Sequence, residues 1–152
     1  MMFMLVRTLH ILAAIWFTCG VAAYLLARLS MLKSDDARSV QALVGLTGQA
    51  RNFLIRPGSI LLLVFGLWTA YYESWPRFSI HAIVLLAVLV PFIVFTVKGG
   101  RKIEAASTEA VQGGSVTPAL SAALRDRKTV VGEVGIGVIT LLFLILMIIK
   151  PA

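Results

Sequence analysis

Only two histidines occur in the chain, His10 and His81, and each follows an arginine by about one helical turn. Arg7 precedes His10 by three residues and Arg77 precedes His81 by four, so each pair would lie on one helix face. Imidazole is a common axial ligand of haem iron, and guanidinium groups pair well with carboxylates such as the haem propionates. The four residues therefore suggest a bis-histidine haem b site, with the histidines as iron ligands and the arginines beside the propionates.

The composition indicates that lipid surrounds most of the chain. Of 152 residues, 59% are hydrophobic and 14% are charged, and the mean hydropathy is +0.93. A soluble domain of this length could not cover so much apolar surface, because small domains leave a large share of their chain at the boundary with solvent. A single cysteine excludes a disulfide framework and a thiolate zinc site, and two histidines with seven acids disfavour a di-metal carboxylate centre.

Four stretches are long and apolar enough to cross a bilayer, whose core of about 30 Å needs about 20 helical residues. They are residues 4–26, 57–75, 79–97 and 129–149, and charge, Pro or Gly bounds each of them. We therefore expect an all-α fold, a four-helix transmembrane bundle with up-down-up-down topology, in one domain over residues 1–152. Only residues 76–78 separate the second and third spans, which predicts a tight antiparallel hairpin.

The positive charges predict the orientation, because Lys and Arg in short loops stay on the cytoplasmic side. Eleven of the fourteen flank two connections: Arg28, Lys33, Arg38, Arg51 and Arg56 the first, and Lys98, Arg101, Lys102, Arg125, Arg127 and Lys128 the third. Both termini and the short hairpin should then lie outside, with the first and third loops in the cytoplasm. The net charge of +7 is explained by topology, and we expect no nucleic-acid partner.

Both long connections carry helical signals. Apolar residues from Val40 to Ile55 recur at helical spacing after Ser34 and Asp35, which we expect to cap an amphipathic helix that lies at the interface or runs into the second span. In the third connection, Gly113 and Gly114 break the chain, and Thr117 with Pro118 begins another helix. Solvated helical extensions are the favoured interpretation, and a docking surface for another subunit is the alternative.

Small residues along the spans predict close helix contacts. They are Ala13, Ala14, Thr18 and Gly20 in the first span, Gly66 and Ala70 in the second, and Gly132, Gly135 and Gly137 in the fourth. Pro91 should kink the third span, and a neighbour must satisfy the backbone group that it frees. Glu133 is expected to pair with Arg127 or Lys128 at the interface, with proton transfer as the alternative.

Both histidines should lie near the same membrane surface, because odd-numbered spans start on the same side. In a four-helix bundle the first and third helices are diagonal, so their inward faces look at each other. Other interpretations remain open. His10 and His81 are also compatible with packed or interfacial residues, Arg7 and Arg77 with snorkelling side chains, and copper bound with help from Met1, Met2 and Met4 is less favoured.

The chain resembles an uncharacterised bacterial family of small four-span integral membrane proteins. The resemblance rests on the opening run from Leu9 to Trp16, on Gly66 within Phe65–Trp68, and on the closing run from Leu144 to Pro151. It implies a bundle in the bacterial inner membrane and carries no assigned activity. The spacing of His10 and Trp16 is also similar to the first span of the membrane protoporphyrinogen oxidases, in which a first-span histidine binds haem, and of copper-resistance membrane proteins.

Two functional hypotheses follow from the sequence. The first is a non-catalytic subunit that packs with other subunits of a larger membrane complex, respiratory or photosynthetic. The second is a b-type cytochrome-like electron-transfer module that holds haem between His10 and His81. No nucleophile–base pair, glycine-rich phosphate loop or chain of intramembrane acids is present in the sequence, so we do not expect an enzyme.

Overall fold

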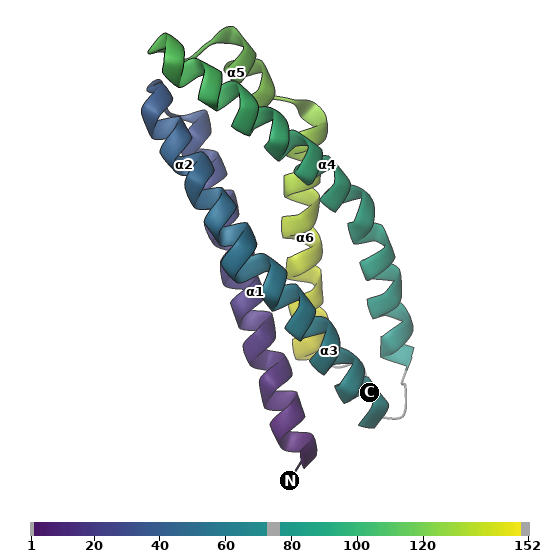
Figure 1. Cartoon of the computed structure of the whole chain (residues 1–152). Coiled ribbons are helices and arrows are strands. Elements are labelled where there is room, and N and C mark those ends of the chain that lie inside the picture. The colour runs from purple at the N-terminus through teal and green to yellow at the C-terminus, as the bar shows by residue number, and fades with distance from the viewer. Residues whose placement is uncertain (1, 73–76, 150–152) are drawn as a thin grey trace.

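The computed structural model is all-helical over the residues that it describes, which are 2–72 and 77–149, with side chains described for 2–72 and 83–145. The elements are α1 (Met2–Leu32), α2 (Ala37–Gln49), the π-helix η1 (Ala50–Ile55), α3 (Arg56–Tyr72), α4 (Arg77–Gly113), α5 (Pro118–Leu124) and α6 (Arg127–Ile149). α2, η1 and α3 form one continuous rod (Figure 1). Four helical stretches are long and apolar enough to cross a membrane, which confirms the all-α membrane fold expected from the sequence.

The first and second spans form an antiparallel pair, α1 with η1 and α3. Three glycines set the close approach between them. A Cβ atom on Gly20 would lie 2.7 Å from that of Leu54, one on Gly58 would lie 3.0 Å from the Phe17 backbone, and one on Gly66 would lie 3.0 Å from His10. Small residues are the expected means of helix association in lipid, where apolar side chains gain nothing by leaving their surroundings.

The third and fourth spans form a second antiparallel pair, α4 with α6. The closest approach is at Gly99, where a Cβ atom would overlap the Thr129 side chain, and a Cβ atom on Gly135 would overlap the ring of Phe92. A Cβ atom on Gly132 would lie 3.0 Å from the Phe92 carbonyl oxygen. Of the small residues that the sequence singled out in the fourth span, Gly132 and Gly135 thus form the contact with α4, whereas Gly137 lies next to Leu25 of α1.

The tight hairpin expected between the second and third spans depends on a connection, residues 73–76, that lies outside the described residues. α3 and α4 follow each other in the chain, but the helix that packs along α3 is α1, and α4 packs along α6 (Figure 1). The glycines explain this choice, because Gly58 and Gly66 of α3 face α1 while Gly99 of α4 faces α6. The two pairs join through α1 and α6, and through α2 and α4 beyond the spans.

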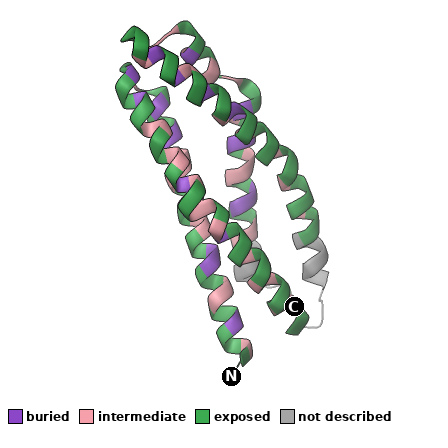
Figure 2. Ribbon diagram, in the orientation of Figure 1, coloured by how far each residue is buried: buried purple, intermediate pink, exposed green. Residues whose placement is uncertain are grey.

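The two long connections pack on each other at one end of the molecule, which we call the basic end: the end of α1, α2, the second half of α4, and α5. Its buried core includes Met31, Val40, Ile103 and Leu120. The third connection is therefore mostly helix, because α4 continues without a break from the predicted span to Gly113. Figure 2 places most of the buried residues here and along α1 and α6.

The helix ends at the basic end follow the expected signals, with one correction. Gly114 has a φ of 74°, and Thr117 caps α5 with Pro118 in its first turn, as predicted. Asp36, rather than Ser34 or Asp35, caps α2, because its carboxylate accepts hydrogen bonds from the Ser39 hydroxyl and amide. The Ser39 hydroxyl is the main cause that holds the pKa of the Asp36 carboxyl below its usual value. The helix after this cap runs on into the second span.

Replacing Gly99 by alanine tests the contact between α4 and α6. The new methyl group would overlap Thr129, so we expect Gly99→Ala to lower the free energy of unfolding by about 1–3 kcal/mol. Gly45→Ala is the matched control, because no atom lies within 4 Å of its new methyl group, and it should be neutral or stabilising. Unfolding in a mild detergent measures both, and equal stability of the two variants would contradict the packing.

Candidate functional site

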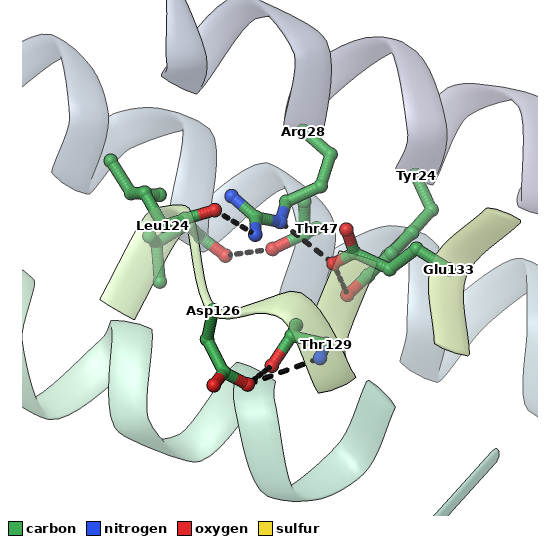
Figure 3. Close-up of polar contacts among 8 residues, drawn as sticks. Tyr24, Arg28, Thr47, Leu124, Asp126, Thr129 and Glu133 are labelled. Carbon is green, nitrogen blue, oxygen red and sulfur yellow. Dashed lines mark hydrogen bonds and ion pairs between the residues drawn. The ribbon is translucent and has the colours of Figure 1, made fainter. Parts of the chain in front are cut away.

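A buried ion pair joins the first and fourth spans near the basic end. The Nε atom of Arg28 donates to Oε1 of Glu133 at 2.7 Å, and the two side chains are 4% and 7% exposed. The Tyr24 hydroxyl lies 3.1 Å from the same carboxylate oxygen and donates to it. Figure 3 shows the three side chains converging between the two helices. A charge taken out of water needs both a partner and hydrogen bonds, and Glu133 obtains both from α1.

Arg28 also holds the corner between α5 and α6. Its Nη2 atom donates to the Leu124 carbonyl oxygen at 2.9 Å (Figure 3). Leu124 is the last residue of α5, where carbonyl groups have no partner within the helix. Beyond the corner, Asp126 accepts hydrogen bonds from the amide and hydroxyl of Thr129 and so caps α6. One guanidinium therefore fixes the beginning of the fourth span against the end of the first.

Arg51 brings a second positive charge to this cluster. The contacts of α1 with α3 and η1 set an antiparallel register that places Arg51 opposite Tyr24, and its guanidinium approaches Gly100 of α4. Two buried N–H groups, on Nη1 of Arg28 and Nε of Arg51, have no hydrogen-bond partner. The cluster thus holds two guanidinium groups and one carboxylate, which leaves an excess of positive charge and of donors.

The structure corrects the partner expected for Glu133. Arg127 and Lys128 are both exposed, and Glu133 pairs instead with Arg28. Lys128 and Arg127 precede Glu133 by five and six residues, which are not spacings that bring side chains together on a helix. The direction of the spans could have identified Arg28. The first and fourth spans run in opposite directions, so the end of the first lies near the same membrane surface as the beginning of the fourth, which carries Glu133.

His10 lies in the contact between α1 and α3. Its imidazole packs against Gly66 and the backbone near Leu62, and its Nδ1 atom is buried without a partner. Arg7 is exposed, one turn away. The backbones of Arg77 and His81 belong to the first turns of α4, and their side chains lie outside the described residues.

The predicted haem site needs both histidine side chains, and that of His81 lies outside the described residues. On the side of the first span, the His10 imidazole packs on Gly66 of α3, and α1 packs with α3 and α6. No group of three or more His, Cys, Asp or Glu side chains gathers within the part of the chain searched for such sites. The haem site remains a prediction from the sequence alone.

Trp16 has a structural role that the sequence did not reveal. Pro57 has no N–H for the Phe53 carbonyl, four residues earlier, and its ring would clash with that carbonyl. The helix widens there into η1, in which the Arg56 amide donates a hydrogen bond to the Arg51 carbonyl oxygen, five residues earlier. The Trp16 indole Nε1 atom lies 3.3 Å from the freed Phe53 carbonyl oxygen and donates to it. The first span thus replaces the bond that Pro57 removes.

The apolar spans, the glycine contacts and the buried ion pair are features of a protein that spans a lipid bilayer. A comparison of the chain with protein families agrees. Residues 4–151 match the family of predicted integral membrane proteins DUF2269. The chain belongs to this family. Neither the curated proteins nor the solved structures compared with this DUF2269 chain gave a match. The resemblance to a family of small integral membrane proteins is confirmed, and it assigns no activity.

Removing one member of the ion pair should destabilise the protein strongly. We expect Glu133→Leu to lower the free energy of unfolding by about 3–5 kcal/mol, because it leaves the Arg28 charge buried without a partner. The double variant Arg28→Met/Glu133→Leu should recover most of this loss. Glu109→Leu, at an exposed position of α4, should change stability by less than about 0.5 kcal/mol. Thermal unfolding in detergent measures all three, and a double variant as unstable as the single one would contradict the pairing.

The indole hydrogen bond gives a second prediction. Trp16→Phe keeps an aromatic ring but removes the donor, so it should cost about 1–3 kcal/mol. In a Pro57→Ala background the cost should be small, because the alanine amide can donate to the Phe53 carbonyl. Trp68→Phe is the control, since the Trp68 indole makes no described hydrogen bond. The account fails if Trp16→Phe costs the same in both backgrounds.

Proposed function

We propose that this DUF2269 protein is a non-catalytic subunit that packs against other membrane-spanning chains through α3 and α4. The observation that carries the proposal is the position of Pro91. It lies on an exposed part of α4 and has no N–H for the carbonyl of Ala87, which is also exposed. An unsatisfied carbonyl in the hydrocarbon core costs several kcal/mol, so a donor must come from elsewhere.

Pro57, at the start of the second span, shows what such a donor looks like. Pro57 frees the Phe53 carbonyl in the same way, and the Trp16 indole donates to it. Among the side-chain hydrogen bonds of the described residues, none reaches the Ala87 carbonyl. A hydroxyl, indole or amide group on a partner helix would supply the missing bond, and it would explain why a proline is placed on an outward face.

The burial of the spans points to the same helices. In the most apolar windows of the second and third spans 6% of the residues are buried, against 22% and 28% in the first and fourth. One narrow stripe of each helix faces its partner, and the remaining apolar side chains are exposed (Figure 2). Lipid can surround exposed apolar side chains without any partner protein. The exposed side chains of α3 and α4 therefore support the proposal only together with the carbonyl of Ala87.

The charges support an orientation for the subunit. Eleven of the fourteen Lys and Arg residues lie at the basic end or within the helix turns that lead to it. By the positive-inside rule we place this end in the cytoplasm and the start of α1 on the outer side of a bacterial inner membrane. A respiratory or photosynthetic complex, which holds many small helical subunits, is the kind of assembly that this proposal favours.

Photo-crosslinking in intact membranes tests the docking face. A crosslinking amino acid at Val88, exposed on α4 beside Ala87, should give one protein adduct of defined mass. The same group at Ile11, exposed on α1, is the control and should give lipid adducts alone. The proposal also expects a native gel in mild detergent to show a species larger than the 16.5 kDa chain in its micelle. Lipid adducts alone at both positions, with a monomer on the gel, would overturn it.

A further inference from the structure

An apolar groove runs between the first and fourth spans. It has a volume of about 160 Å³ and is lined from Thr18 to Leu25 on α1 and from Gly137 to Leu144 on α6. The two threonines within it do not make it polar, because the Thr18 and Thr140 hydroxyls donate to carbonyl groups of their own helices. The groove is smaller than the pockets of about 300–1000 Å³ that hold drug-sized molecules, so a flexible chain fits it better than a ring system.

The groove ends at the buried ion pair. Arg28 follows Leu25 by three residues and Glu133 precedes Gly137 by four, so both lie on the helix faces that line the groove. Beyond them, the corner between α5 and α6 carries the exposed cations Arg125 and Arg127. The one acid within this corner, Asp126, already accepts two hydrogen bonds from Thr129. An apolar groove thus leads to a cationic end that has unused donors.

We propose that this groove holds one acyl chain of an anionic phospholipid, whose phosphate contacts Arg125 and Arg127 at the corner. The occupant matches both parts of the site, a flexible apolar chain along the spans and a negative oxyanion at the basic end. A zwitterionic lipid would offer the same chain but would add a positive group beside the two arginines. A peptide segment would need its backbone groups satisfied, and neither threonine hydroxyl in the groove has a free proton to donate to a peptide carbonyl. The inference does not depend on the proposed subunit role.

The bound lipid would lie at the contact between the two helix pairs. Within the spans, the main contact between the two helix pairs among the described residues is that of α1 with α6, and the groove lies along it. A chain that fills the groove would add van der Waals contacts to both helices. We therefore expect the lipid to stabilise the joined pairs as well as to bind.

Native mass spectrometry of the detergent-purified protein tests the proposal, with phosphatidylglycerol and phosphatidylcholine of identical chains as probes. Phosphatidylglycerol should bind more tightly and raise the unfolding temperature, and Arg125→Gln/Arg127→Gln should weaken its binding by about fivefold for each cation removed. Lys33→Gln/Arg38→Gln removes two exposed cations at the same end, away from the corner, and should bind the lipid as the parent does. Ala22→Phe should fill the groove and abolish binding, and Leu26→Phe, exposed and outside the groove, is its control.

A third probe, inorganic phosphate, separates the lipid from a free anion. No shift in unfolding temperature with millimolar phosphate supports the lipid, whereas displacement of phosphatidylglycerol by phosphate would assign the site to a free anion and overturn the proposal. Equal binding of the two lipids would also overturn it. So would an equal loss of phosphatidylglycerol binding in Arg125→Gln/Arg127→Gln and in Lys33→Gln/Arg38→Gln. If Ala22→Phe does not fold, the exposed cation variants still decide the question.

Discussion

The contact between α1 and α6 is the interaction on which the rest of the structure depends. In lipid, apolar side chains gain little from packing together, so helices associate through close backbone approach and polar bonds. Glycines provide that approach within each helix pair, at Gly20, Gly58 and Gly66 in one and at Gly99, Gly132 and Gly135 in the other. Between the pairs, the Arg28–Glu133 ion pair provides the polar bond. The packed connections at the basic end hold the two pairs together from outside the spans.

This arrangement leaves the second and third spans largely uncovered. α3 and α4 each contribute one narrow face to a pair, and the bundle does not close between them over the described residues. Under the subunit role that we propose, these surfaces would contact other chains, and one neighbour would donate to the carbonyl of Ala87 on α4. The apolar groove between α1 and α6 meets a different need, because a lipid there would complete a contact that the chain makes only in part.

Much of the fold could be predicted from the sequence because hydropathy and chain breaks are local. The four spans, the break at Gly114, the cap at Thr117 and the small residues at helix contacts all follow from runs of a few residues. The choice of partners could not be predicted, because α3 pairs with α1 rather than with its neighbour in sequence for reasons of matched glycine positions. Pro57 illustrates the same limit: it predicts an interruption, but only the structure shows a continuous rod with the Trp16 indole replacing the lost bond.

The candidate site was harder to predict than the fold. The sequence singles out His10 and His81 because histidines are rare in this chain, and the structure places His10 in a helix contact with Gly66. The charge pattern places Arg28 at the edge of the first connection, although it lies four residues before the end of α1 and is almost wholly buried. A charge at the end of one span is ambiguous in sequence, since it can reach the interface or turn inward. The presence of one acid, Glu133, at the matching depth decides between the two, and pairing opposite charges across spans of opposite direction would have found it.

Crosslinking of two cysteines in native membranes measures the joining of the two pairs most directly. In a Cys19→Ser background, Leu25→Cys with Gly137→Cys places thiols on α1 and α6 where the Leu25 side chain now lies 3.1 Å from the Cβ position of Gly137. A short bifunctional thiol reagent should link this pair rapidly and leave Val64→Cys with Val88→Cys, on α3 and α4, unlinked. Rapid linking between α3 and α4 with none between α1 and α6 would contradict the arrangement described here.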